Sequence, residues 1–160
     1  MRAPVRSCIA ASAVTTLATL LGSVLVATPA SADRTFHTSR YELTSVAGAP
    51  LRSGFVIDIH AEGPRIYAQE RYLLSGALPS TKYEVVLLIH ASTTCRPSIT
   101  DLALTTATFT TNRAGNGNAG TTFRPEDAAG LVQDEYGLVW QVTTGGEVVY
   151  TTGCQVVALD

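Results

Sequence analysis

The sequence is poor in positive charge. It contains 11 lysine and arginine residues among 160, and Lys82 is the one lysine. If residues 1–32 are removed, nine basic and thirteen acidic residues remain, which gives a formal net charge of −4. A protein that binds nucleic acid or anionic lipid needs a basic patch or stripe. We therefore expect neither nucleic acid nor a membrane as a partner of the mature chain.

The common signatures of catalysis are also missing. No serine lies in a G-x-S-x-G context, and none of the three histidines has an obvious nucleophile beside it. The adjacent carboxylates Glu126-Asp127 and Asp134-Glu135 are typical of solvated loops rather than of a glycosidase site. We therefore predict that the chain is not an enzyme, with no catalytic residues and no cofactor.

Helical periodicity is almost absent, apart from a short candidate helix at 125–133. Short runs rich in Val, Ile, Thr, Tyr and Phe alternate instead with clusters of Gly, Pro, Asn and Asp, which is the pattern of a sandwich or barrel. The expected strands cover 55–61, 65–74, 82–91, 102–111, 121–123, 136–144, 148–152 and 154–160. The sequence thus predicts an all-β Greek-key β-sandwich of about seven to eight strands.

Three details of this sandwich can be predicted from the pattern. In 55–61 we expect Phe55, Ile57 and Ile59 to face the core and the polar residues between them to face solvent. In 82–91 both faces are largely apolar, which predicts a central strand. The Asn/Gly-rich segment 112–120 predicts a hairpin turn between 102–111 and 121–123.

The first 32 residues have the features of a secretory signal peptide. Arg2 and Arg6 precede an uncharged, largely apolar run from Ile9 to Val26, and Ala30-Ser31-Ala32 forms a small-x-small cleavage signal. A membrane anchor is the alternative, but Ser, Thr and Gly dilute the run. We predict cleavage after residue 32, a single domain at 33–160, and a secreted, extracellular or envelope-associated location.

Two cysteines remain in the mature chain, Cys95 and Cys154, because Cys8 leaves with the signal peptide. An even number of cysteines in an exported protein favours a disulfide. Free thiols or a metal pair are the alternative, but neither cysteine belongs to a C-x-x-C motif. The disulfide would close a loop of about 60 residues, worth about 4 kcal/mol in the chain-entropy model.

Three residues are candidates for a metal site. Asp58 and His60 lie two apart and should project from one face of their strand, and His90 ends another strand. If the two strands were neighbours, these side chains could converge on zinc or copper. The other interpretation is that all three are ordinary polar residues at strand faces and ends, and we expect no bound metal.

Aromatic residues are the remaining candidates for a functional surface. Trp140 alternates with Tyr136, Leu138 and Val142, which predicts a core position. Tyrosines are common in binding faces, and four of those in the expected strands are candidates for one: Tyr67, Tyr72, Tyr83 and Tyr150.

Three segments resemble bacterial copper–zinc superoxide dismutases: LPSTKYEVVLLIHASTTCRP (78–97), TTATFTTNRAGNGNA (105–119) and TTGCQVVALD (151–160). In that family a strand ends in His-x-His, a disulfide cysteine follows, and the last strand begins with its partner cysteine. The resemblance implies an eight-stranded Greek-key sandwich, in agreement with the strand pattern.

The metal ligands of that family mostly do not carry over. His90 matches the second histidine of the His-x-His pair, but Leu88 stands at the first position. No histidine lies between Cys95 and Cys154, where the family places further ligands, and Thr151 stands where its active-site arginine would be. The resemblance therefore implies a sandwich without the copper site, because one imidazole cannot hold a redox copper ion.

These observations favour a secreted, non-catalytic binding or interaction module. Its partner would be a protein, a glycan or a small-molecule ligand. One alternative is a copper- or zinc-binding, dismutase-like protein that uses Asp58, His60 and His90. Another is a structural cell-envelope protein or a secreted inhibitor. Fold alone does not decide among them.

Overall fold

The computed structural model describes residues 37–46, 48–60, 68–96, 101–124, 126–127, 131 and 134–159. The predicted signal peptide at 1–32 lies outside these ranges, as does most of the candidate helix at 125–133. Within the described ranges, no helix has the length and apolar character needed to cross a membrane.

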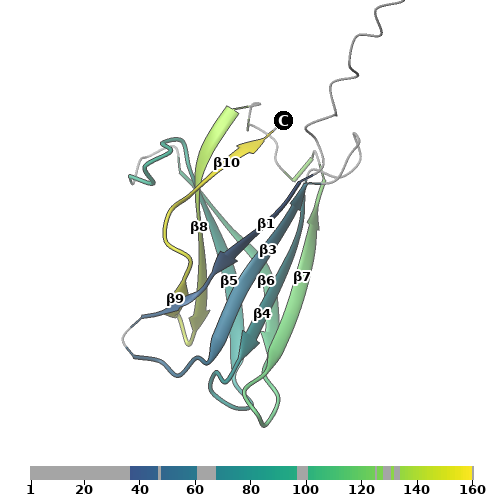
Figure 1. The fold of residues 1–160 in the computed structure, drawn as a ribbon, viewed down its shortest axis with the longest axis vertical. Coiled ribbons are helices and arrows are strands. Elements are labelled where there is room, and N and C mark those ends of the chain that lie inside the picture. The colour runs from purple at the N-terminus through teal and green to yellow at the C-terminus, as the bar shows by residue number, and fades with distance from the viewer. Residues whose placement is uncertain are drawn as a thin grey trace, which may run out of the picture. The chain divides into compact units, whose positions relative to one another are not determined.

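The described residues form ten strands in two antiparallel sheets, which face each other as a sandwich (Figure 1). The four-stranded sheet has the order β1-β3-β4-β7, with bounds His37–Glu42, Ser53–His60, Ala68–Ser75 and Gly117–Phe123. The other sheet has the order β2-β9-β8-β5-β6, with bounds Thr44–Ser45, Glu147–Thr151, Asp134–Thr144, Lys82–His90 and Leu102–Thr110. β10 (Gln155–Leu159) pairs with β8.

The predicted all-β sandwich is confirmed, with more strands than expected. β1 and β2 were not anticipated, because HTSRYE and TS offer no run of apolar residues. β1 instead alternates half-buried and exposed residues at the edge of its sheet, where it pairs with β3 alone. Such an edge strand contributes little apolar signal to the sequence.

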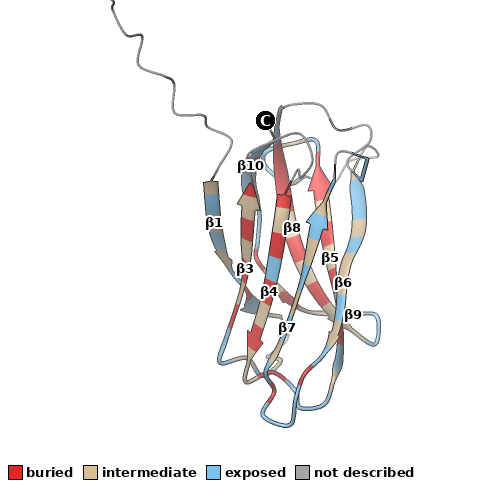
Figure 2. Cartoon of the chain, turned by 90° about the vertical axis from the view of Figure 1, so that its right-hand side faces the viewer, coloured by how far each residue is buried: buried red, intermediate tan, exposed pale blue. Residues whose placement is uncertain are grey.

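The core lies between the sheets, and β5 and β8 each supply four of its buried apolar residues. β5 is central, between β6 and β8, as its two apolar faces predicted, and Val85, Leu87 and Ile89 point inward. Trp140 on β8 is fully buried, which confirms its predicted core position. Figure 2 shows the buried residues on β3, β4, β5 and β8, whereas the edge strands β6 and β7 carry intermediate and exposed residues.

The predicted orientation of β3 is wrong. Val56, Asp58 and His60 are buried between the sheets, and Phe55, Ile57 and Ile59 are half-buried on the outer face. The physical reason is register: directly paired residues of neighbouring strands point to the same face. Val56 pairs with the buried Tyr72 of β4, so the even-numbered residues of β3 face the core.

The predicted hairpin around 112–120 is also wrong in its pairing. β6 and β7 belong to different sheets, and the turn between them carries the chain from one sheet to the other. The Oδ1 of Asn112 accepts the backbone N–H groups of Ala114 and Asn116 at 2.9 and 3.0 Å. Gly115 has φ +73°, and a Cβ there would lie 2.0 Å from the Ala77 carbonyl oxygen. The Asn/Gly pattern predicts a reversal, but it does not determine which sheet the next strand joins.

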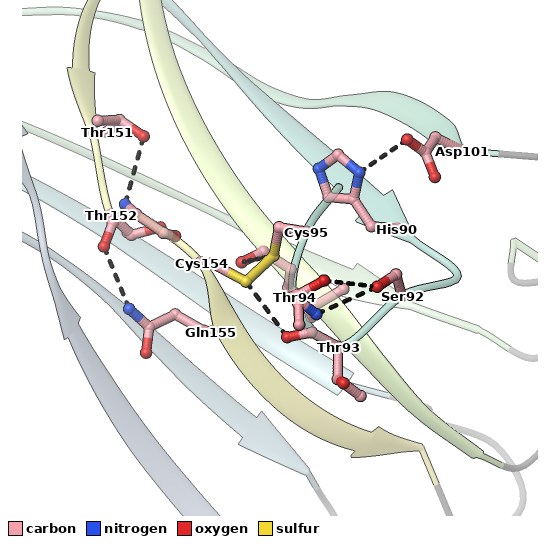
Figure 3. Close-up of a disulfide and its surroundings, with 12 residues drawn as sticks. His90, Ser92, Thr93, Thr94, Cys95, Asp101, Thr151, Thr152, Cys154 and Gln155 are labelled. Atoms are coloured by element: carbon pink, nitrogen blue, oxygen red, sulfur yellow. Dashed lines mark hydrogen bonds and ion pairs between the residues drawn. A yellow bond between two sulfur atoms is a disulfide. The ribbon is translucent and has the colours of Figure 1, made fainter. Parts of the chain in front are cut away.

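The disulfide between Cys95 and Cys154 is confirmed, with the two Cα atoms 5.7 Å apart (Figure 3). It joins the loop after β5 to the segment that leads into β10, and both of these strands pair with β8. Gly137 of β8 lies beneath this loop. A Cβ at that position would lie 2.7 Å from the Sγ of Cys95, so a glycine lets the disulfide pack against the sheet.

Candidate functional site

A row of polar residues crosses the inner face of the four-stranded sheet. Asp58 of β3 pairs directly with Ser39 of β1 on one side and with Glu70 of β4 on the other. Glu70 in turn pairs with Thr121 of β7. Asp58 and Glu70 are each only 2% exposed. Two carboxyl groups are therefore buried side by side in a place where a sandwich normally holds apolar side chains.

Hydrogen bonds connect these carboxyl groups to their surroundings. The Nε2 of His60 donates to the Oδ2 of Asp58 at 3.0 Å. The Tyr72 hydroxyl donates to the Oε2 of Glu70 and forms a second hydrogen bond, of 2.7 Å, with the Oγ1 of Thr106. Because Thr106 lies on β6, this second bond joins the two sheets. We call Asp58, His60, Glu70, Tyr72 and Thr106 the buried polar cluster.

Burial raises the pKa of Glu70 to about 7. The hydrogen bond from Tyr72, the nearby indole of Trp140 and the attraction of His60 oppose the increase, and the negative charge of Asp58 adds to it. Burial likewise raises the pKa of the Tyr72 hydroxyl, and the charge of Glu70 reinforces this effect. Tyr72 therefore stays neutral near pH 7, whereas Glu70 changes its charge there.

Two polar atoms in this region have no hydrogen-bond partner among the described groups. They are the Oδ1 of Asp58 and the Nε1 of Trp140. The indole N–H lies near enough to Glu70 to favour its ionised form, but it does not reach hydrogen-bonding geometry with any described atom. A buried acceptor without a donor costs about 1–3 kcal/mol. Such an atom marks a place where a further donor would be stabilising.

The cluster borders a cavity of about 40 Å³ at the end of the sandwich where β3 ends and β4 begins. Asp58, His60 and Glu70 form its polar part. The remaining wall is mainly apolar and comes from both sheets; it includes Leu87, Ile89, Leu104, Phe123 and Leu138. We call this cavity the end pocket.

The structure brings two of the three candidate metal ligands together and separates the third. Asp58 and His60 share one face of β3 and are hydrogen-bonded, as their spacing predicted. His90 belongs to the other sheet, and its Nδ1 lies 2.7 Å from the Oδ2 of Asp101 (Figure 3). Within the described part of the chain, no three His, Cys, Asp or Glu side chains are grouped to hold a metal ion.

The tyrosines considered for a binding face are in the core. Tyr72, Tyr83 and Tyr150 are at most 1% exposed, and Tyr67 lies outside the described residues. Glu70 was not predicted as part of a site, and Tyr72 was predicted only as a candidate for a binding face. Their shared face was visible from their spacing of two residues, but the partnership of Glu70 with Asp58 depends on the register of β3 and β4.

The outward-facing side of the four-stranded sheet has an unusual composition as a result of the orientation of β3. Ile57 lies at its centre, paired with Arg40 on one side and Arg71 on the other, and both arginines are exposed. Phe55 pairs with Leu73 in the adjacent row, and the guanidinium of Arg40 lies 3.9 Å from the centre of the Phe55 ring. We call Arg40, Phe55, Ile57, Ile59, Arg71 and Leu73 the outer face.

A hollow of about 370 Å³ adjoins the outer face beside Phe55 and Leu73. Its other walls are mostly polar and include Asn112, Asn116 and Asn118. The outer face thus combines a half-buried apolar centre, two cations and a polar border.

Comparisons with protein-family models, with curated proteins and with solved structures find no match to this chain.

Proposed function

We propose that the chain is an exported, non-catalytic binding module that contacts a partner protein through the outer face. The observation that carries this proposal is the reversed orientation of β3. This strand places Phe55, Ile57 and Ile59 on the outside of the sandwich and polar residues inside. If a partner covers the outer side of β3, the apolar side chains on that side are buried in the complex.

The composition of the outer face supports a protein as the partner. Aromatic residues and arginine are enriched in protein–protein interfaces, in which an apolar centre is surrounded by a polar border. Residues of this kind also carry most of the binding energy in such interfaces. The outer face has this arrangement around Ile57, with Arg40 and Arg71 on either side.

The charge of the outer face indicates what kind of partner surface is complementary to it. The sequence has a net charge of −2, yet Arg40 and Arg71 expose two positive charges at the middle of the outer face. The complementary surface is an apolar patch bordered by carboxylates, because opposite charges speed association and select the partner. The disulfide supports export, since such bonds persist in oxidising compartments.

The metal-binding alternative has less support from the structure than from the sequence. This alternative requires Asp58, His60 and His90 to converge. His90, however, lies in the other sheet, and its side chain forms a hydrogen bond with Asp101. Elemental analysis of untagged protein tests this alternative directly. A stoichiometric metal that is lost in His60→Ala would favour it over a metal-free module.

The experiment that tests the proposal compares Ile57→Asp with Val86→Asp. Both substitutions place a carboxylate at a half-buried position of a strand in the interior of its sheet, and both strands also bear buried residues facing the core. A photoreactive residue at position 57 identifies the partner by cross-linking in the native secreted or envelope fraction. The Kd of the purified pair is then measured for the wild type and both variants.

We expect Ile57→Asp and the charge reversal Arg71→Glu to weaken binding by about 2 kcal/mol or more, as at interface hot spots. Val86→Asp should leave the Kd unchanged, and thermal unfolding shows whether each variant is folded. Equal losses in Ile57→Asp and Val86→Asp would reject the outer face as the contact surface. A turnover in oxidase, hydrolase or dismutase assays that one point mutation abolishes would reject the non-catalytic function.

A further inference from the structure

The end pocket lies on the opposite side of β3 from the outer face, and it has two chemically distinct parts. Leu87 and Ile89 of β5, Leu104 of β6 and Leu138 of β8 supply aliphatic walls from the six-stranded sheet. Phe123 of β7 closes the pocket from the four-stranded sheet. A ligand that fits these walls must have an apolar body.

Of the four described polar residues that line the pocket, three bear carboxyl groups and the fourth is His60. Asp58 and Glu70 lie at its inner end, and the exposed Asp127 borders it near the surface. The Nε2 of His60 is already directed to the Oδ2 of Asp58, while the Oδ1 of Asp58 has no hydrogen-bond partner among the described residues. Among the described residues that line the pocket, none is a lysine or an arginine. Apart from His60, the described lining residues supply no positive charge, and none of them donates to the Oδ1 of Asp58.

We propose that the end pocket binds a short alkylammonium group, with the ammonium on the free Oδ1 of Asp58 and the alkyl chain between the two sheets. The group belongs either to a small free amine or to the lysine side chain of a protein partner. The two sources share their chemistry: three N–H donors and a positive charge on an aliphatic stem.

An ammonium fits this site better than the other classes of ligand. An anion would be repelled by the carboxylates that line the pocket, because an unpaired charge of like sign is costly in a buried site. A metal ion needs several converging ligands, and no such group of three is present in the described ranges. A neutral apolar molecule would pack against the apolar walls but leave the Oδ1 of Asp58 without a donor.

The size of the pocket limits the length of the ligand. The cavity volume is about 40 Å³, and one water molecule needs about 10–15 Å³ in the same measure. The space therefore exceeds that of a single water and accommodates a chain of a few heavy atoms. A butylammonium ion and the end of a lysine side chain are both of this kind.

The test is a titration of the purified protein, expressed from the full chain, with n-butylammonium, followed by NMR chemical shifts. n-Butanol is the neutral control of the same length, and calcium and zinc salts are titrated separately. A peptide with one blocked lysine represents the protein source. Binding of butylammonium alone indicates a free amine, and binding of the peptide alone indicates a partner's lysine. Binding of both supports the shared chemistry, and binding of neither overturns the proposal.

The matched variants are Asp58→Asn and Asp101→Asn. Each replaces a carboxylate that is hydrogen-bonded to a histidine, but only Asp58 lines the end pocket. We expect Asp58→Asn to weaken butylammonium binding at least about tenfold, equivalent to about 1.4 kcal/mol, and Asp101→Asn to leave it unchanged. If Asp58→Asn does not fold, Ala68→Val narrows the pocket and leaves Asp58 in place, with the same expected loss.

Three further results would overturn the proposal. The first is butanol binding as tightly as butylammonium, which would indicate an apolar site. The second is a divalent cation displacing butylammonium with much higher affinity. The third is unchanged affinity in a folded Asp58→Asn or Ala68→Val variant. None of these results affects the proposed partner contact at Ile57, which lies on the other side of β3.

Discussion

Asp58 and Glu70 lie directly opposite each other on β3 and β4, with both side chains buried between the two sheets. Like charges in directly opposed positions destabilise a sheet, and burial increases the cost. The two carboxyl groups have different hydrogen-bond partners. Asp58 has the imidazole of His60 as a partner, whereas Glu70 has the neutral hydroxyl of Tyr72. Burial raises the pKa of Glu70, so Glu70 holds its proton to higher pH than an ordinary glutamate.

The first prediction concerns the dependence of stability on pH. The pKa of Glu70 is about 7 in the folded protein against 4.5 for an ordinary glutamate, so the folded state binds this proton more tightly than the unfolded state. The contribution of Glu70 to stability is complete below pH 4.5 and is lost as the pH rises to about 7. Glu70→Gln should remove this loss, which is on the order of 3 kcal/mol.

The measurement is the unfolding free energy from urea titrations at several pH values, for the wild type and Glu70→Gln. The control is Glu84→Gln, which removes an exposed carboxylate on β5. Glu84→Gln should follow the wild-type profile. If Glu70→Gln also follows it, the proton is not held by Glu70.

A second prediction concerns the hydrogen bond between the sheets. Tyr72→Phe removes the hydroxyl that contacts both Glu70 and Thr106, and Thr106→Val removes the partner on β6. Each change should lower the unfolding free energy by about 1–3 kcal/mol, because buried partners lose a hydrogen bond. The double variant should cost less than the sum, by about 0.5–3 kcal/mol, because the two residues interact.

Chemical denaturation of the two single variants and the double variant gives this coupling energy. Thr108→Val is the control, since Thr108 is exposed on the same strand. It should change stability by no more than about 0.5 kcal/mol. Strict additivity of Tyr72→Phe and Thr106→Val would show that the contact between the sheets contributes nothing.

Two strands show how far the sequence determines this fold. β5 was predicted correctly, including its central position, because both of its faces are apolar and either orientation buries apolar residues. The predicted orientation of β3 was reversed, because the alternation of apolar and polar residues alone favours burial of Phe55, Ile57 and Ile59. Its orientation depends on pairing with β4, and such long-range register cannot be read from one strand.

The candidate site was predictable to the same limited extent. The spacing of Asp58 and His60 placed them correctly on one face, and the two cysteines were correctly paired. Glu70 joins them only through the pairing of β3 with β4, and Thr106 only through the packing of one sheet on the other. Contacts between sheets leave no periodic signal in the sequence, so these members of the cluster could not be found.

The third prediction is that loss of the disulfide lowers stability by about 4 kcal/mol in the chain-entropy model for a loop of this length. Cys95 and Cys154 are 59 residues apart in the sequence, so the bond restricts a large part of the unfolded chain. The measurement compares urea unfolding of the wild type with that of Cys95→Ala/Cys154→Ala. Thiol titration of residues 33–160, unfolded and unreduced, should detect no free cysteine. Two reactive thiols would contradict the bond.

The last prediction concerns Gly137, which lies beneath the disulfide loop. A Cβ at this position would lie 2.4 Å from the Ser92 carbonyl oxygen and 2.7 Å from the Sγ of Cys95. Gly137→Ala must therefore displace the loop, and we expect a loss of about 1–3 kcal/mol, as for other overpacked sites.

The disulfide-free background provides the control for this prediction. In Cys95→Ala/Cys154→Ala the loop is no longer tied to Cys154, and the Sγ atom that the new methyl group would meet is absent. Gly137→Ala should therefore cost less there than in the wild type, with a coupling energy of at least about 0.5 kcal/mol between the sites. An equal cost in both backgrounds would mean that the glycine is required by the strand itself. The disulfide loop would then not be the reason for a glycine at this position of β8.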